Sequence, residues 1–393
     1  MEIMLMLSTK PLKNGSARGI VAYCRHSKSS PTAKGGYYMS AGAPSFWTGR
    51  LANDAGLTGP VEPADFLDAL EGKIGGEDIR KGRADRRHGS DVTFSAPKSV
   101  SLMCLAGGDQ RIAEAHDAAV RAGMEYIEKE VAASRYGKNG LKTARGGGIA
   151  AAVFRHEDSR SVSGEADPQL HSHAIVVNMT TGGDGKLRAI DLDWGQHAVR
   201  MHLADAVYKT ILARNLISLG YAVEATGDGF ELADISPYAI EHFSQRRNQI
   251  DQALKSAGID RTDSTATQRT AANLRTRQGK SSLSQQDQRH EWHNRAVDIG
   301  LGLPGVVRRA IRSGTRPAPE STAGAAVRSA ARHLNERSTI FSKDQIRLDA
   351  LKNGIGSSTI DEIDRAIAAG EAGLLDVGAG AMTTVDALYK EQT

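Results

Sequence analysis

The sequence has little cysteine: among its 393 residues only Cys24 and Cys104 carry a thiol. Two thiols can build neither a disulfide framework nor a four-cysteine zinc site, so we expect a cytoplasmic, reducing compartment. A run of about 18 apolar residues is also lacking, so we expect no membrane insertion. The opening segment MEIMLMLSTK has neither a basic leader nor a cleavage site, and it is predicted to be a first strand instead of a signal peptide.

Basic charge is concentrated in two segments of a chain whose net charge is only +4. Residues 1 to 50 contain seven lysines and arginines and one acidic residue, and residues 243 to 290 contain nine basic and four acidic residues. Both segments could contact the phosphates of a nucleic acid. The simpler interpretation of either segment alone is a solvated surface.

Apolar periodicity predicts a mixed α and β organisation in the first half of the chain. Residues 148 to 156 and 170 to 180 are predicted strands joined by a polar loop, and residues 91 to 106 contain a strand, a proline turn and a second apolar element. Helical spacing of apolar residues begins after Asp109 and ends before Gly137. A second apolar stripe predicts a helix over residues 196 to 219.

The second half of the chain is more polar. Residues 236 to 300 are predicted to form basic helices with few apolar residues, and such a segment needs a surface on which to become ordered. Glycine and proline mark residues 301 to 326 as a linker, and residues 327 to 393 are predicted to form a small, mainly helical segment. At this length the chain is expected to contain two or three domains.

Three histidines are candidate metal ligands. His171 and His173 are two residues apart in a predicted strand, so their side chains project from the same face. His156 ends the preceding strand and reaches the same point if the two strands form an antiparallel hairpin. Three neutral imidazoles leave coordination positions open for water or substrate, as in a catalytic site. The alternative is that the histidines are ordinary packed or surface residues.

The identity of the ion is left open by the spacing. Imidazole ligands favour zinc and the later transition metals, whereas a phosphate substrate supplies hard oxygens that suit magnesium or manganese. We therefore expect a divalent metal, magnesium or manganese first, with zinc or another transition metal as the alternative.

Tyr23, Tyr37 and Tyr38 lie within the basic first 50 residues. Nearby positive charge favours the phenolate, which can attack a phosphodiester and later leave it again. Base stacking or packing is the alternative role of each tyrosine.

Asp91 could act as a general base for the phenol, orient a histidine, or be an exposed cap. Lys98 could pair with a phosphate or be solvated.

Several motifs together resemble those of the MobF-type conjugative relaxases, the TrwC and TraI class of the HUH endonuclease superfamily. The three most specific are GSDVTFSAPKSVSLM at 89 to 103, FRHEDSR at 154 to 160 and DPQLHSHAIVVNMT at 167 to 180. GGYYMSAGAPSFWTGR, AGLTGPV and LADAVYKTILARNLISLGY extend the resemblance over roughly the first 300 residues.

The resemblance implies an α+β fold: a central antiparallel sheet flanked by helices, the HUH palm, with a helical lid from about residue 236. It implies a relaxase domain over residues 1 to 300. His156, His171 and His173 match the metal ligands of the family, and Asp91 matches its active-site aspartate. Tyr23 matches the first, attacking tyrosine, and Tyr37 or Tyr38 matches the second tyrosine pair.

The implied activity is metal-dependent nicking and rejoining of one DNA strand at a plasmid transfer origin, through a covalent 5′-phosphotyrosyl intermediate. The implied partners are single-stranded and hairpin DNA of that origin, relaxosome accessory proteins and a type IV secretion coupling protein. Residues 333 to 351 and 382 to 393 resemble the segment before the helicase of such relaxases. The chain is therefore expected to be the N-terminal portion of a longer relaxase-helicase.

Three alternatives remain open from the sequence. A rolling-circle replication initiator uses the same chemistry, although here the tyrosines precede the histidines. A sequence-specific DNA-binding module with structural histidines would bind without cleaving. A metal-dependent hydrolase of small phosphodiesters would release free products and never become joined to DNA.

Overall fold

The computed structural model of the chain describes residues 7–12, 20, 44–79, 87–195, 198–227, 229–277, 279, 283–317 and 319–390. Tyr23, Tyr37 and Tyr38 lie outside the described residues. None of the helices in the described part combines the length and apolarity needed to cross a membrane.

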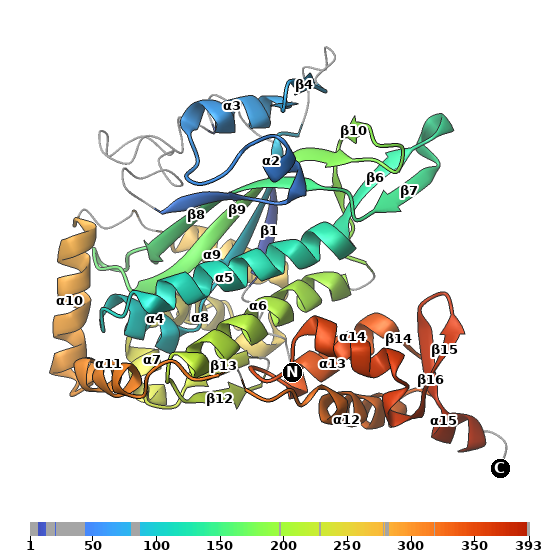
Figure 1. The fold of residues 1–393 in the computed structure, drawn as a ribbon. Helices are drawn as coiled ribbons and strands as arrows, with labels where there is room; N and C mark the ends of the chain where they lie inside the picture. Colours follow the sequence, from blue (N-terminus) through green and yellow to red (C-terminus); the bar gives the residue numbers. More distant parts are fainter. Residues whose placement is uncertain are drawn as a thin grey trace.

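A central antiparallel sheet organises the molecule, as predicted (Figure 1). Its strand order is β1 (Leu7–Leu12), β5 (Gly89–Ser95), β9 (Pro168–Thr181), β8 (Ile149–Asp158) and β2 (Ser45–Thr48), with β10 (Leu187–Arg188) paired to β9. The predicted hairpin is confirmed, because β8 and β9 pair along most of their length. The predicted first strand is present as β1.

The two faces of the sheet have separate apolar cores. Alternate residues of β9 enter different clusters: Ala174 and Val176 face one way, and Ile175 and Val177 face the other. The first face is covered by α4 (Lys98–Leu105), α5 (Arg111–Tyr126) and α6 (Val199–Ser218). The second face is covered by α2 (Arg50–Asp54) and α3 (Pro63–Glu71), followed by the hairpin of β3 (Lys73–Ile74) and β4 (Glu77–Asp78).

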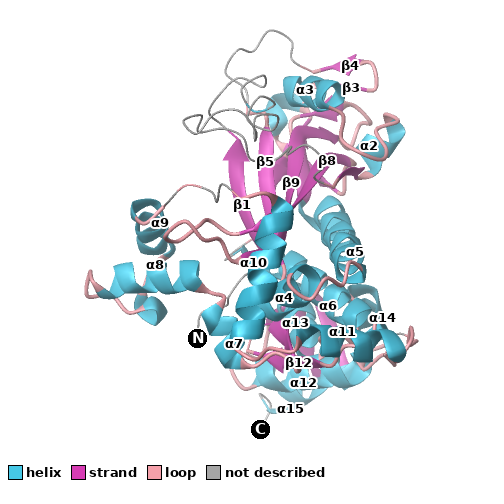
Figure 2. Ribbon diagram, turned by 90° about the vertical axis from the view of Figure 1, so that its left-hand side faces the viewer, coloured by secondary structure: helices cyan, strands magenta, loops and turns pink. Residues whose placement is uncertain are grey.

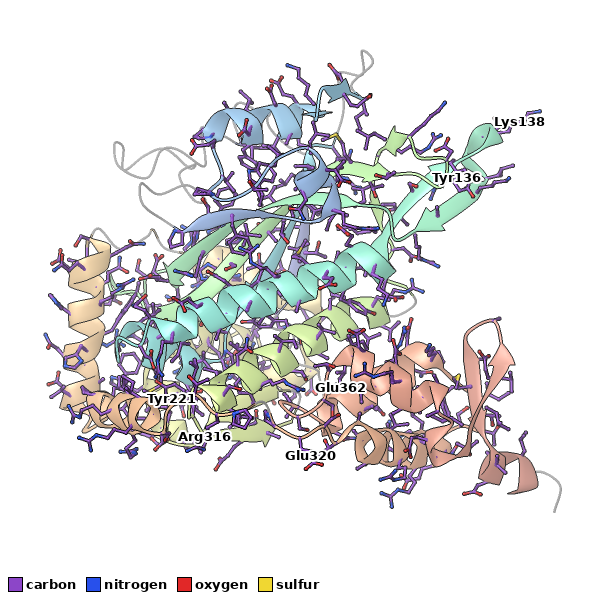
Figure 3. The ribbon with its side chains drawn as sticks, viewed as in Figure 1. Tyr136, Lys138, Tyr221, Arg316, Glu320 and Glu362 are labelled. Carbon is purple, nitrogen blue, oxygen red and sulfur yellow. The ribbon has the colours of Figure 1, made fainter. Side chains whose placement is uncertain are left out.

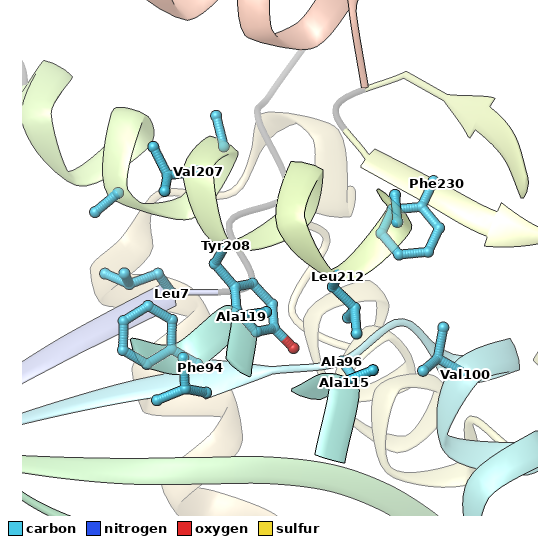
Figure 4. Close-up of a cluster of buried hydrophobic side chains, with 14 of the residues drawn as sticks. Leu7, Phe94, Ala96, Val100, Ala115, Ala119, Val207, Tyr208, Leu212 and Phe230 are labelled. Carbon is cyan, nitrogen blue, oxygen red and sulfur yellow. The ribbon is translucent and has the colours of Figure 1, made fainter. Parts of the chain in front are cut away.

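Large side chains join the sheet to α6 on the first face. The rings of Phe94 and Tyr208 lie 5.3 Å apart, beside Leu7 and Leu212 (Figure 4). All four are almost completely buried. Helices α5 and α6 lie side by side under the sheet (Figure 1), and their close packing resists sliding of the strands relative to the helices.

The helix predicted to run from Asp109 towards Gly137 ends earlier than expected. After α5 the chain makes a π-helical turn, Ile127–Val131, and then enters β6, Ala132–Tyr136. β6 pairs with β7 (Lys142–Arg145) on one side and with β11 (Asp191–Leu192) on the other. The helix prediction is wrong over residues 132–136 because pairing with strands from distant sequence outweighs local helical spacing.

The polar helices predicted after residue 236 are present. They are α7 (Pro237–His242), α8 (Gln245–Lys255), α9 (Ala266–Arg275) and α10 (Gln285–Asp298), and they follow the hairpin β12 (Val223–Thr226) and β13 (Gly229–Leu232). Figure 2 shows α8 and α9 standing to one side of the sheet and α10 running along its end. Helix α10 is fixed there by three contacts: Arg289 with Glu157 at 2.5 Å, Trp292 Nε1 with the Ala166 carbonyl at 2.7 Å, and Arg295 with Asp167 at 3.0 Å.

The segment predicted to be a linker, residues 301–326, contains a packed helix, α11 (Leu303–Arg312). Leu303, Val306 and Ala310 of this helix are buried. Pro304 lies in the first turn, where a missing backbone N–H breaks no hydrogen bond, so the proline starts this helix instead of preventing it. The linker prediction is therefore wrong for residues 303–312.

The last part of the chain contains the predicted helices and also an unpredicted small sheet. The helices are α12 (Ala323–Asn335), α13 (Lys343–Asn353), α14 (Ile360–Ala368) and α15 (Val385–Lys390), and the sheet has the order β14 (Phe341–Ser342), β16 (Ala381–Thr384) and β15 (Leu374–Gly378). This part docks against α6 through ion pairs, including Arg214 with Glu362 at 3.3 Å and Arg200 with Asp344 at 3.5 Å. Figure 3 labels Glu362 on α14, facing α6.

We predict that Leu303→Ala lowers the free energy of unfolding by about 2 to 5 kcal/mol, because it opens a cavity under α11. The control is Ile311→Ala on the same helix, where the side chain is 54% exposed. Thermal unfolding of both variants measures the difference. Equal, small effects would mean that residues 303–312 behave as an unpacked linker after all.

Candidate metal centre

Three imidazoles converge near one end of the two central strands. The ring centroids of His156, His171 and His173 lie 5.3 Å from one another in all three pairs. One ring nitrogen of each lies within 4.8 Å of the corresponding nitrogens of the other two, and all three residues are buried. Three histidine nitrogens gathered this closely could hold a single ion.

The strand register creates this convergence. His171 and His173 share a face of β9 because side chains alternate along a strand. His156 on β8 is the direct partner of His171 in the antiparallel ladder. The register shifts immediately afterwards, between His156 and Asp158, so the ladder is irregular next to the triad.

Hydrogen bonds orient two of the three rings. The Nδ1 atom of His171 lies 2.8 Å from the carbonyl oxygen of Gln169, which can only accept, so this nitrogen carries the proton. The neutral ring then presents the lone pair of Nε2. The Nδ1 atom of His173 lies 2.9 Å and 3.0 Å from the two carboxylate oxygens of Asp91, which fixes that ring in the same tautomer.

The donor set fits a divalent ion. In His171 and His173 the Nδ1 atom donates to an acceptor, as is usual for histidines that bind a metal through the other ring nitrogen. The third, His156, comes from the neighbouring strand, so the protein supplies three nitrogens and leaves further positions for other ligands. The triad is the one cluster of three or more histidine, cysteine or carboxylate ligands found among the described residues.

Asp91 is a buried acceptor in this arrangement. It is 5% exposed, and its carboxylate contacts His173 directly. This position matches the role of orienting a histidine, and the interpretation of Asp91 as an exposed cap is wrong.

Two contributors were missed from the sequence. The hydroxyl of Thr93 lies 3.0 Å from Nδ1 of His173 and 3.2 Å from Asp91. Thr93 is two residues from Asp91 on β5 and pairs with His173 in the ladder. Because side chains alternate along a strand, the sequence could have placed Thr93 on the same face as Asp91. Nothing in the sequence points to the carbonyl of Gln169, because every residue has a backbone carbonyl.

Lys98 is neither solvated nor at the triad. Its ammonium group donates to the carbonyl of Pro168 at 2.7 Å, and burial lowers the pKa of Lys98 to about 8. The solvated interpretation is therefore wrong. Lys98 lines a cavity of about 880 Å³ that begins beside the triad, at Ser95 and Gln169.

This cavity is predominantly basic. Six lysine and arginine side chains and two acidic side chains line it. The basic residues come from α4, α6, α8, α9 and the turn between α8 and α9, and they are Lys98, Lys209, Arg246, Arg247, Arg261 and Arg269. Burial and the nearby guanidinium groups of Arg277 and Arg160 lower the pKa of Arg246. Positive charge is therefore crowded around the cavity, which favours a ligand with several negative charges.

Comparison with known proteins gives a consistent result. Residues 17–299 match the family model described as TrwC relaxase. The chain is 29% identical over 377 residues to the multifunctional conjugation protein TraI of Escherichia coli. That alignment covers 90% of this chain and 21% of the relative, so the chain spans about a fifth of the length of the curated relatives it matches.

Solved structures of a conjugative relaxase, TrwC, are also similar. A metal-free complex of TrwC with OriT DNA is 36% identical and has a TM-score of 0.65, covering 76% of this chain and 99% of that chain. A copper-bound complex of TrwC with OriT DNA is 35% identical with the same TM-score and coverage. A third complex contains a 27-mer DNA comprising the recognition hairpin and the cleavage site, at 34% identity and a TM-score of 0.64.

We predict that Asp91→Ala weakens the binding of Mn²⁺ by about 10- to 100-fold, because the His173 ring loses the acceptor that holds its tautomer. Isothermal titration calorimetry on the purified chain measures the dissociation constant. His156→Ala serves as the reference for loss of a ligand, and Asp376→Ala, on an exposed strand far from the triad, serves as the neutral control. Unchanged affinity in Asp91→Ala would show that the carboxylate does not support the site.

Proposed function

The chain belongs to the TrwC relaxase family, and we propose on that basis that it nicks and rejoins one DNA strand at a plasmid transfer origin. The observation that carries the proposal is the convergence of His156, His171 and His173 beside a basic cavity. A pure DNA-binding module has no need of three converging buried imidazoles, two of them oriented by hydrogen bonds. A hydrolase of small phosphodiesters has no need of so long a basic lining.

We assign the attack to Tyr23, by its match to the first tyrosine of the family. Its phenol oxygen bonds to the phosphorus at the nick site, and the bond from phosphorus to the 3′ oxygen breaks. The phenol gives up its proton to solvent, and the departing oxygen takes one to become a free 3′ hydroxyl. The product is a 5′-phosphotyrosyl link, and the reverse step rejoins the strand without a nucleotide cofactor.

An ion held by the triad would draw charge from the non-bridging oxygens of the phosphate as it is attacked. We propose magnesium or manganese as the natural ion, because phosphate oxygens are hard ligands, with zinc or another transition metal accepted because imidazoles bind these well. The copper-bound TrwC complex supports such tolerance in a similar protein. Asp91 and Gln169 would orient two of these imidazoles by accepting from their Nδ1 atoms.

We propose that Tyr37 or Tyr38 performs the second strand transfer of the family. The single strand leading to the nick site is proposed to occupy the cavity of about 880 Å³ under α8 and α9. These helices, with α7 and α10, form the lid. The contacts of α10 with Glu157 near the end of β8, and with Ala166 and Asp167 immediately before β9, anchor one side of that lid to the sheet.

The β6–β7 hairpin is proposed to grip duplex DNA. It projects from the body of the protein as a two-stranded ribbon, with Tyr136 and Lys138 towards its tip (Figure 3). Its exposed basic residues include Arg135, Lys138 and Lys142, and Leu141 is 84% exposed. A two-stranded ribbon fits the major groove, and a hairpin in the origin DNA supplies a short duplex of the required kind.

The domain division is also a proposal. Residues 1–300 form the relaxase unit including the lid, residues 301–326 connect it to the tail with α11 as a packed element, and residues 327–393 form the unit before a helicase in a longer chain. The other proposed partners are relaxosome accessory proteins and a type IV secretion coupling protein, with the cytoplasm as the compartment.

We predict that Tyr23→Phe abolishes the covalent adduct on an origin oligonucleotide, because the substituted ring has no oxygen to bond to phosphorus. Binding of the oligonucleotide persists, since the basic cavity is unchanged. A denaturing gel with Mn²⁺ present, followed by mass mapping of the modified tyrosine, measures both yield and position. Chelation with EDTA should prevent the adduct in the unchanged protein. Normal adduct yield in Tyr23→Phe would move the attack to Tyr37 or Tyr38.

We predict that the double variant Lys138→Ala, Lys142→Ala weakens binding to a hairpin oligonucleotide and lowers the slope of log K against log salt by about two, one for each lost phosphate contact. Fluorescence anisotropy over a salt series measures this. A single strand without the hairpin should bind both proteins equally. Equal loss on both oligonucleotides would place the two lysines on the single strand instead.

A further inference from the structure

Behind the histidine triad, on the opposite face of the sheet, helix α5 presents two consecutive polar side chains, His116 and Asp117. Both are set among the apolar residues that join α5 to the sheet. His116 is completely buried, and neither residue takes part in the chemistry proposed above. Each contacts a residue that directly adjoins a histidine of the triad.

His116 holds strand β9. Its Nε2 atom lies 2.8 Å from the hydroxyl of Ser172, the residue between His171 and His173. Its Nδ1 atom lies 2.9 Å from the hydroxyl of Tyr208 on α6, whose ring Figure 4 shows among the buried side chains. Burial lowers the pKa of His116 to about 3, so the ring is neutral and has one donor and one acceptor nitrogen for its two hydroxyl partners.

Asp117 holds strand β8. The guanidinium of Arg155, which precedes His156, donates to the carboxylate of Asp117 at 2.5 Å. The pair is mostly buried: the Arg155 side chain is 12% exposed and that of Asp117 is 22% exposed. The same guanidinium reaches back to the carbonyl of Ala113 on α5 at 3.4 Å.

The two anchored residues are themselves partners. Arg155 pairs with Ser172 in the β8–β9 ladder, next to the pair formed by His156 and His171. Because side chains alternate, Arg155 and Ser172 point to α5 while the histidines point to the opposite face. One helix therefore holds both strands at the residue pair next to His156 and His171, on the side where the ladder is regular.

We propose that His116 and Asp117 are positioning residues for the metal centre, setting the separation and register of the two strands that carry its histidines. The inference rests on the proposed metal site, and it extends that site to the far face of the sheet. A metal tolerates errors of only about 0.2 Å in the ligand distances, so a small shift between β8 and β9 weakens binding. Supporting residues of this kind usually contribute about 10- to 100-fold in metal affinity.

The test compares two variants with Tyr208→Phe: Ser172→Ala, which removes the hydroxyl that contacts His116, and Asp117→Asn, which removes the negative charge paired with Arg155. Tyr208→Phe removes the other partner of His116 and keeps the contact to β9. We expect the first two variants to bind Mn²⁺ about tenfold more weakly than the unchanged protein, and Tyr208→Phe to bind it within about twofold. Calorimetry measures the dissociation constants. Adduct yield should recover in both variants at saturating Mn²⁺, because the triad is still present.

A purely structural role would give a different pattern. The melting temperature without metal reports loss of fold stability, and its rise on adding Mn²⁺ reports affinity even in a less stable variant. If Ser172→Ala and Asp117→Asn show the same rise as the unchanged protein, or if Tyr208→Phe weakens Mn²⁺ binding as much as they do, the proposal is overturned. Absence of any covalent adduct in the unchanged protein would contradict the proposed function alone, since Mn²⁺ affinity is measured without DNA.

Discussion

The pairing of His156 with His171 across β8 and β9 is the constraint on which the rest of the site depends. A shift of one residue in this ladder would turn His156 to the opposite face and leave two ligands in place of three. The register is fixed because both faces of these strands are buried in separate apolar cores. The geometry of the metal centre is therefore a consequence of packing along the whole sheet, not only of the residues around the ion.

The two faces of the sheet have different roles. One face carries the imidazoles and their acceptors, Asp91 and the Gln169 carbonyl. The other face carries α5 and α6, which are fixed to the strands by apolar packing and by the polar contacts of His116 and Asp117. Such an arrangement supports the imidazoles from behind, so that the geometry of the ligands is held by the packing of the opposite face.

The polar helices from residue 237 onward have few apolar residues of their own, and they are ordered because the sheet side supplies their partners. The carboxylates of Glu157, near the end of β8, and Asp167, immediately before β9, accept hydrogen bonds from Arg289 and Arg295 of α10. Four arginines of this region line the cavity next to the triad: Arg246, Arg247, Arg261 and Arg269. The ends of β8 and β9 thus connect the strands that carry the histidines with the lid proposed to cover the single strand.

The sequence by itself determined the period-two spacing of His171 and His173, the hairpin that brings His156 to them, the antiparallel sheet and the family. The histidine spacing and the hairpin are local or pairwise patterns that follow from alternation along strands, whereas the sheet and the family follow from the motifs that resemble those of the TrwC class. Only the tertiary structure decided that Asp91 orients His173, that Lys98 is buried, that residues 132–136 leave the helix for a sheet, and that residues 303–312 pack as a helix. Each of these outcomes depends on partners distant in sequence, whose burial and hydrogen bonds outweigh the local preference of the segment.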